Sequence, residues 1–424
     1  MIRLKFLCFL LLVANGGNLF AQASKRVLFL GNSYTYVNNL PQLCRDVALS
    51  AGDTLAVDVN ANGGQTLQGH FTDNTSISKI NQANWDYVVL QEQSQRPSFS
   101  QSQVEIEVFP YARGLDSMIN AANACTETIF YMTWGRKNGD AGNCAVWPPV
   151  CTYSGMDSML YLRYMAMAND NEALVSPVGQ FWKYLRANHP LIELYQPDES
   201  HPSAEGSYAA ACCFYAIIFQ KNPLLITYDF NLNAAVAADI RQAAKLVVFD
   251  SLSNWNVGRY APQANFSSYR DTLSTIASVT FTNNSVHYDS VYWDFGDGNS
   301  SNAINPIHTY PQSDSFRVVL TVFSCGQMDT FSQIVVIPSL VGLQNIPKAT
   351  VSIYPNPASG QLFVESERLL VERLEIIDAL GKSHQPVYQH SNHRTIIDIQ
   401  ELPAGAYWLR ISGETKIHPF VIIK

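Results

Sequence analysis

Charge is scarce in this chain. Only 15% of its 424 residues are Asp, Glu, Lys or Arg, while 12% are aromatic. This composition is typical of an ordered protein and argues against a largely disordered one. The formal net charge is −8 and basic residues form no cluster, so the chain lacks the basic surface on which nucleic-acid binding depends.

Long apolar runs are also missing, apart from a short one at the N-terminus. The basic start Met1–Lys5 is followed by the apolar Phe6–Ala14 and by the small-residue site Ala21-Gln-Ala23. This order predicts a secretory signal peptide over residues 1–23, with the mature chain beginning near Ser24. The apolar run is too short to span a bilayer, and no later segment is long and apolar enough. We therefore expect an exported protein without a transmembrane segment.

Cysteines are few, and their spacing resembles no zinc site. Seven remain after the leader: Cys44, Cys125, Cys144, Cys151, Cys212, Cys213 and Cys325. Because seven is odd, at least one is unpaired or joined to another molecule. Cys144 and Cys151 flank a Trp-Pro-Pro loop and are predicted to form a disulfide in an oxidising compartment. Cys212 and Cys213 lie in an apolar helix, where a role as small buried hydrophobic residues is at least as well supported as a disulfide.

From residue 24 to 258 the chain alternates apolar strand-like runs with helix-like patterns. The runs are Val27–Leu30, Leu55–Val59, Tyr87–Leu90, Ile129–Met132 and Leu174–Val175. Predicted helices include one with Pro41 in its first turn and Gly52 past its end, followed later by Phe181–Asn188 and Ser203–Gln220. Short continuous apolar strands between helices predict a three-layer α/β/α domain around a parallel sheet.

Polar residues follow the strands at the points where ligands bind in such sheets. Ser33 follows the first strand, Asn62–Thr66 the second and Gln91–Gln95 the third, while Asp198 and His201 are expected just before the last helix of the domain. A serine hydroxyl is a poor nucleophile at neutral pH and needs an oriented histidine base, which an Asp-x-x-His segment can supply. The pattern indicates a serine esterase.

These motifs resemble those of the SGNH (GDSL-like) hydrolase superfamily, over Val27 to about Gln220. Gly31-Asn-Ser-Tyr-Thr35 is similar to its first block, with asparagine in place of the commoner aspartate; Gly64 matches the second block, and Asp198-x-x-His201-Pro-Ser the fifth. The resemblance implies Ser33 as nucleophile, His201 as base and Asp198 as the residue that orients it. It also implies that the backbone N–H groups of Ser33 and Gly64 stabilise the oxyanion.

The third block departs from the family pattern, because no asparagine is present to donate a third hydrogen bond to the oxyanion. The resemblance to a branch of secreted bacterial esterases with Gln-x-x-Ser at this place favours Gln91 for that role. Counting the register favours Gln95. Both remain open from sequence.

Each motif also has a purely structural interpretation. Ser33 alone would cap a helix, Asp-x-x-His alone would begin one, and Gly63-Gly64 alone would be a turn. Their joint order at strand ends favours catalysis.

Other residues near these motifs have two interpretations each. His70 could line the pocket or be a satisfied structural histidine, and Trp134 could stack on a sugar or pack beneath its loop, as could Trp147. Glu92 is expected to be a carboxylate at the pocket edge or in a salt bridge, rather than a second acid catalyst.

Two all-β modules are predicted beyond about residue 260. Tyr292-Trp-Asp-Phe-Gly-Asp-Gly298 and the strand Phe316–Phe323 resemble a PKD-type β-sandwich over 262–338, which implies a spacer or a weak binding role. Its Asp294 and Asp297 are expected to form turns rather than to bind calcium.

The last module, 348–424, follows a predicted linker at Leu340–Lys348. Val351–Pro357, Leu374–Gly381 and Leu402–Tyr407 resemble the type A C-terminal sorting domain of type IX secretion. That resemblance implies passage across the outer membrane of a Bacteroidota-type bacterium, followed by attachment to the cell surface or release.

The sequence as a whole predicts an exported serine esterase that acts on small acyl esters. Deacetylation of polysaccharide is favoured over hydrolysis of lipid. Its expected partners are that ester substrate and the type IX secretion machinery, and no metal or organic cofactor is implied. The alternatives are a non-catalytic surface protein that binds glycans and a lysophospholipase-type lipid esterase.

Overall fold

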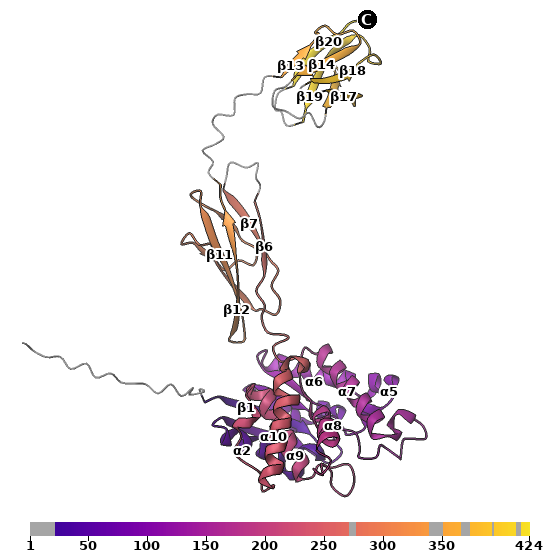
Figure 1. Cartoon of the computed structure of the whole chain (residues 1–424), viewed down its shortest axis with the longest axis vertical. Helices are drawn as coiled ribbons and strands as arrows, with labels where there is room; N and C mark the ends of the chain where they lie inside the picture. Colours follow the sequence, from indigo (N-terminus) through magenta and orange to yellow (C-terminus); the bar gives the residue numbers. More distant parts are fainter. Residues whose placement is uncertain (1–21, 271–276, 339–350, 366–373, 392–393, 413–416) are drawn as a thin grey trace, which may run out of the picture.

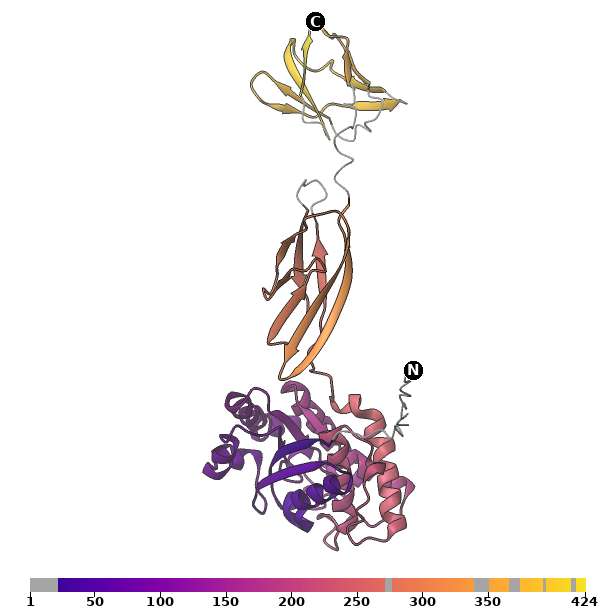
Figure 2. The ribbon, with the colours of Figure 1, turned by 90° about the vertical axis from the view of Figure 1, so that its left-hand side faces the viewer.

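The computed structural model describes residues 22–270, 277–338, 351–365, 374–391, 394–412 and 417–424. The chain forms three bodies in succession, an α/β domain followed by two all-β domains, each with its own apolar core (Figures 1 and 2). The predicted signal peptide and the predicted linker at Leu340–Lys348 lie outside the described residues, apart from Gln22 and Ala23.

The first domain is built on a five-stranded parallel sheet in the order β2-β1-β3-β4-β5. Its strands are β1 (Ser24–Gly31), β2 (Thr54–Ala61), β3 (Tyr87–Leu90), β4 (Glu127–Tyr131) and β5 (Leu174–Ser176). All five coincide with the predicted apolar runs. The strand order reverses between β1 and β3, which is where open α/β sheets leave a crevice for ligands.

Helices cover both faces of this sheet, so the predicted three-layer α/β/α fold is confirmed. On one face α2 packs against α9, which also contacts α8 and α10; on the other, α6 packs against α3, α5 and α7. The helices are α1 (Ser33–Tyr36), α2 (Leu40–Ser50), α3 (Leu67–Thr72), α4 (Asn74–Ile80), α5 (Gln101–Glu107), α6 (Phe109–Ala122), α7 (Tyr153–Asp170), α8 (Val178–Asn188), α9 (Ala204–Phe219) and α10 (Ala234–Val247).

The helix that follows the Asp-x-x-His segment is the most buried helix of the domain. Fourteen of the 16 residues of α9 are buried, among them Cys212 and Cys213. Both thiols are free, as is that of Cys44, so these three cysteines act as small core residues. The expectation that α9 is the last helix of the domain was wrong, because α10 follows it and packs against it.

The second domain is a sandwich of two antiparallel sheets, ordered β10-β7-β6 and β12-β11-β8-β9. Its strands are β6 (Phe266–Tyr269), β7 (Ser278–Asn283), β8 (Ser290–Asp294), β9 (Ser300–Ser301), β10 (Ile307–Thr309), β11 (Ser315–Ser324) and β12 (Gln327–Val336). Strand β8 ends at Asp294, whose carboxylate accepts a hydrogen bond from the N–H of Gly296 where the chain turns. The Asp297 carboxylate contacts Asn299 and His308, so both aspartates shape this turn as predicted.

The third domain also consists of two antiparallel sheets, β13-β14-β18-β17 and β16-β15-β19-β20. The strands are β13 (Ser352–Tyr354), β14 (Gln361–Glu365), β15 (Leu374–Asp378), β16 (Ser383–His384), β17 (Tyr388–Ser391), β18 (Arg394–Asp398), β19 (Gly405–Ile411) and β20 (His418–Ile422).

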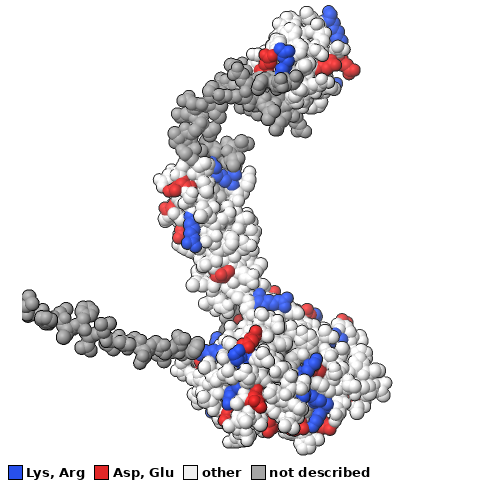
Figure 3. All heavy atoms as spheres, viewed as in Figure 1, with Lys and Arg blue, Asp and Glu red and all other residues white. Residues whose placement is uncertain are grey.

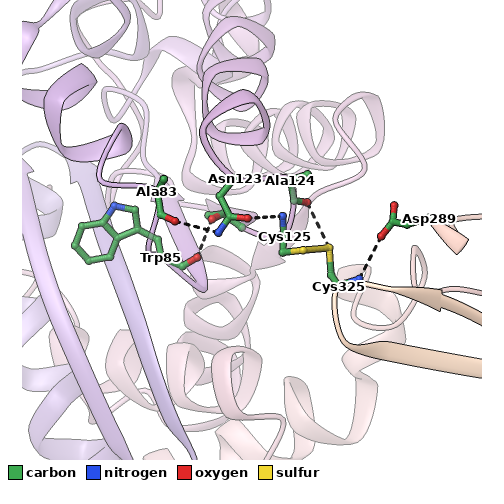
Figure 4. Close-up of a disulfide and its surroundings, with 8 residues drawn as sticks. Ala83, Trp85, Asn123, Ala124, Cys125, Asp289 and Cys325 are labelled. Atoms are coloured by element: carbon green, nitrogen blue, oxygen red, sulfur yellow. Dashed lines mark hydrogen bonds between the residues drawn. A yellow bond between two sulfur atoms is a disulfide. The ribbon is translucent and has the colours of Figure 1, made fainter.

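Two disulfides are present among the described residues, and only one was expected. Cys144–Cys151 closes the Trp-Pro-Pro loop, which confirms that prediction. Cys125–Cys325 joins the first domain to the tip of the β11–β12 hairpin of the second, across 200 positions of sequence (Figure 4). Cys125 lies just before β4, so this bond is made at the edge of the sheet where the strands begin.

The surface carries few charges, and those of both signs are scattered over the face seen in Figure 3. A cleft of about 600 Å³ runs along the domain junction beside Cys125 and Cys325, with Asp116, Glu127 and Glu172 among its lining residues. No helix within the described ranges is long and apolar enough to cross a membrane.

Candidate active site

The turn that carries Ser33 is held by its neighbours at the carboxyl end of β1. Asn32 caps the short helix α1, with its side-chain oxygen accepting from the N–H of Tyr34 at 3.1 Å. Tyr34 and Thr35 are buried, whereas Ser33 is half-buried and Tyr36 is exposed. The helix therefore points Ser33 and Tyr36 outward and anchors itself with the two residues between them.

Gln91, at the end of β3, fixes this turn from below. Its side-chain oxygen accepts from the N–H of Asn32 and the hydroxyl of Thr35, both at 2.9 Å. Its NH₂ group donates to the side-chain oxygen of Asn32 at 3.0 Å and to the backbone oxygen of Glu92. Both N–H bonds of this fully buried amide are therefore used within the protein.

Asn32 also explains why the first block reads Gly-Asn-Ser. Its NH₂ group donates to the backbone oxygen of Gln65 at 2.9 Å, a bond that an ionised aspartate could not make. Gly31 is required for close packing, because a Cβ there would lie 2.2 Å from the hydroxyl oxygen of Thr35 and 2.7 Å from the side-chain oxygen of Gln91. The first three blocks are thus joined around Asn32.

The second block is an exposed turn next to this bond. Gly64 has a φ of +69°, a conformation that favours glycine. Within the part of the chain that the structure describes, the N–H groups of Ser33 and Gly64 have no hydrogen-bond partner. Both remain available to an incoming acceptor.

The Asp-x-x-His segment forms a tight loop in which Asp198 makes two contacts with His201 and one with Ser200. One carboxylate oxygen accepts from the N–H groups of Ser200 and His201, at 3.1 and 2.9 Å. The other contacts Nδ1 of the imidazole. Burial raises the pKa of Asp198, but the hydrogen bonds from His201 and the backbone outweigh that effect, and its pKa lies below the usual value. This ionised carboxylate is suited to orient an imidazole and stabilise its protonated form.

Two side chains join the His201 loop to the Ser33 turn. The hydroxyl of Tyr34 bonds that of Ser200 at 2.7 Å, and its ring meets the His201 ring edge-on with 5.5 Å between centroids. The NH₂ group of Asn38 donates to the backbone oxygens of Pro202 and Ser203, at 3.2 and 2.9 Å. The structure thus brings together the two segments that carry the predicted nucleophile and base.

Gln95 differs from Gln91 in the way its amide is used. Its side-chain oxygen accepts from Arg136 at 2.6 Å and lies near the Gln93 amide and the Ser94 hydroxyl, at 3.3 and 3.4 Å. Three donors around one oxygen fix the orientation of the amide, so its NH₂ group faces the other way. That group has no partner among the described residues.

Two predicted substrate contacts are corrected by the structure. His70 is fully buried, with Nε2 bonded to the backbone oxygen of Gly31 at 2.9 Å and Nδ1 to the Ser76 hydroxyl at 2.8 Å. Burial lowers its pKa, and a neutral ring that is protonated on Nε2 donates to the Gly31 carbonyl. His70 is the structural histidine of the two interpretations.

Trp134 is buried as well, so it cannot stack on a sugar. Its ring lies between those of Tyr34 and Trp182, with centroids 4.7 and 3.7 Å away, and its N–H donates to the backbone oxygen of Ser200 at 3.1 Å. Trp134 supports the His201 loop from beneath. Trp147 is half-buried and donates to the backbone oxygen of Ser98.

Glu92 matches neither expected role, because it is buried rather than at a pocket edge and forms no salt bridge with any residue that the structure describes. It is fully buried, and its carboxylate accepts from the N–H groups of Gln93 and Leu67, which ties the third block to the start of α3. Burial raises its pKa to about 7, and the backbone hydrogen bonds oppose that shift only in part.

The raised pKa of Glu92 predicts that the free energy of unfolding depends on pH. Because the folded pKa exceeds the unfolded value, the stabilisation by protonated Glu92 is present at pH below the unfolded pKa and is lost as the pH rises through about 7. Glu92→Gln removes this titration. We expect the free energy of unfolding of wild type, measured by urea titration, to fall relative to that of Glu92→Gln between pH 5 and 8, by up to roughly 3 kcal/mol. Glu105→Gln, at an exposed glutamate, is the control, and parallel profiles for all three proteins would contradict the prediction.

Comparison with known families identifies the two C-terminal domains. Residues 260–337 match the PKD domain model, and 352–424 match the model for a secretion system C-terminal sorting domain. The chain carries a PKD domain and a sorting domain. The sorting domain indicates export to the cell surface or secretion, with the type IX secretion machinery as its partner. The search of curated proteins gave no match.

Solved structures resemble the first and second domains. A protein from Slackia heliotrinireducens, described as a candidate SGNH hydrolase, is 28% identical; the match covers 45% of this chain and 97% of that one, with a TM-score of 0.38. A DUF4886 family protein from Bacteroides uniformis is 15% identical, with coverage of 54% and 95% and a TM-score of 0.46. The PKD1 domain of the Vibrio cholerae metalloprotease PrtV is 31% identical to the PKD domain region, with coverage of 19% and 99% and a TM-score of 0.17.

Proposed function

We propose that the first domain is a serine esterase that hydrolyses small acyl esters outside the cell. The observation that carries the proposal is the Asp198–His201 pair, held against the Ser33 turn by Tyr34 and Asn38. An oriented imidazole next to an outward-facing serine is the arrangement that activates a hydroxyl for attack on a carbonyl. The unpartnered N–H groups of Ser33 and Gly64 support an oxyanion site beside it.

The reaction then proceeds in two halves. The Ser33 hydroxyl oxygen attacks the ester carbonyl while Nε2 of His201 takes its proton, and Asp198 stabilises the imidazolium through Nδ1. The N–H groups of Ser33 and Gly64, with the amide of Gln95, bind the negative oxygen that forms. His201 returns the proton to the leaving alcohol, and water releases the acyl group from Ser33 by the same steps.

Acetyl esters of carbohydrates are the proposed substrates. The export indicated by the sorting domain supports a substrate outside the cell, such as polysaccharide, and the exposed second-block turn Asn62-Gly63-Gly64 carries no apolar side chain. Faster turnover of long-chain than of short-chain esters would instead favour the lipid alternative. Glycan binding without any turnover would favour the non-catalytic one.

A fluorophosphonate ester tests the proposal directly. The Ser33 oxygen forms a bond to phosphorus and fluoride leaves, so mass spectrometry is expected to find one added phosphonyl group on the peptide that contains Ser33. Ser33→Ala should remain unlabelled, and His201→Ala should label much more slowly because its base is gone. A label on Ser94 or Ser200, or none at all, would refute the assignment of the nucleophile.

A further inference from the structure

We infer that Tyr36 is the residue that binds the sugar ring of the substrate, an inference that rests on the proposed esterase function. The sequence directs attention to the aromatic loop beyond β4, but Trp134 is enclosed there and Trp147 is half-buried with its N–H bonded. Tyr36 is 48% exposed. Its hydroxyl has no hydrogen-bond partner among the described residues.

The geometry of α1 sets Tyr36 beside the nucleophile. Residues three apart on a helix share a face, with Cβ atoms about 5–6 Å apart. Ser33 and Tyr36 are in that relation, and the burial of Tyr34 and Thr35 between them shows that this shared face points outward.

The Tyr36 side chain also extends over the second block. A Cβ placed on Gly63 would lie 3.6 Å from the Tyr36 hydroxyl, which is ordinary contact. Gly63 precedes Gly64, whose N–H is proposed to bind the oxyanion. Tyr36 therefore forms a wall next to the position of the reacting carbonyl.

The chemistry of this wall fits a sugar better than an acyl chain. A phenol offers a flat apolar face to the C–H groups of a sugar ring and a hydroxyl that can donate to or accept from sugar hydroxyls. An acetyl group is too small to use a ring of this size. Tyr36 is thus a specificity residue for the alcohol part of the ester, in contact with substrate but not with the proton transfers.

The test compares a sugar ester with an ester that has no ring. With acetylated xylo-oligosaccharides, Tyr36→Ala is expected to raise KM roughly five- to tenfold and to leave kcat within about twofold. With ethyl acetate, followed by pH-stat, KM and kcat should both stay within about twofold of wild type. Tyr36→Phe should retain most of the sugar affinity, because the ring face remains. Tyr161→Ala, at another exposed tyrosine of the same domain, should behave like wild type.

A binding measurement separates this inference from the proposed function. Calorimetry of xylohexaose with the full-length Ser33→Ala protein needs no catalysis, and Tyr36→Ala in that background should weaken the affinity by a similar factor. An unchanged affinity and KM, or an equal loss with ethyl acetate, would overturn the inference. Failure of Ser33 to be labelled, with the binding difference intact, would overturn the esterase function alone.

Discussion

Ser33→Ala is expected to lower kcat/KM for 4-nitrophenyl acetate by a factor on the order of 10⁴ or more. No neighbouring group can replace the oxygen that forms the acyl-enzyme, so only oxyanion binding and positioning would remain. The change removes one half-buried oxygen from a turn that Asn32 and Gln91 hold independently. The thermal unfolding midpoint of the Ser33→Ala protein should therefore stay within about 2 °C of that of wild type.

Variants of His201 and Asp198, the proposed catalytic partners of Ser33, test the same mechanism further. His201→Ala should cost nearly as much, and the double variant little more than either single one, because the residues act as a unit. Asp198→Ala should cost less, since the His201 loop is also held by Tyr34 and Asn38. Rates are compared after subtraction of hydrolysis in buffer, and a Ser33→Ala protein with a tenth or more of wild-type activity would rule out the mechanism.

Gln95→Ala is expected to lower kcat about 100- to 1,000-fold with little change in KM. Removal of one oxyanion donor typically has an effect of this size, because the bond is strongest in the transition state. Gln95→Glu is the matched change: its carboxylate can still accept from Arg136, but it has no N–H to donate. It should be at least as slow as Gln95→Ala while remaining folded.

Gln91 provides the contrast. Its amide already makes four hydrogen bonds inside the protein, so Gln91→Ala should leave buried partners unsatisfied and lower the unfolding midpoint. Full activity in Gln95→Ala, together with a stable but slow Gln91→Ala, would reverse the assignment of the third donor.

The fold of the first domain was predictable because its sheet is covered on both sides. A strand buried on both faces gives a continuous apolar run, as in β1, β3, β4 and β5, whereas the edge strand β2 is only partly buried. Helix α7 has no comparable signal: both its apolar and its polar residues are spread around the helix, so its bounds could not be read from the sequence. Helix α10 does have an apolar face, with Ala237, Ile240, Ala243 and Ala244 buried, but it was not assigned from the sequence.

The candidate site was only partly predictable, since several of its features arise from contacts between distant segments. The order of motifs brings Ser33 and His201 to one edge of the sheet. Which glutamine has a free amide depends on Asn32 and Arg136, which lie far from Gln91 and Gln95 in sequence. The enclosure of Trp134 likewise depends on stacking with Tyr34 and Trp182. Tyr36 had a signal that could have found it, namely its three-residue spacing from Ser33.

The Cys125–Cys325 bond constrains the orientation of the first domain relative to the PKD domain. It joins the PKD domain to the edge where the strands begin, and the peptide chain at Tyr260–Pro262, which lines the same cleft as the disulfide, is a second connection close by. Two covalent connections restrict rotation of the first domain relative to the PKD domain. Ser33 and His201 belong to the opposite edge of the sheet, so the proposed active site faces away from the PKD domain and is not covered by it.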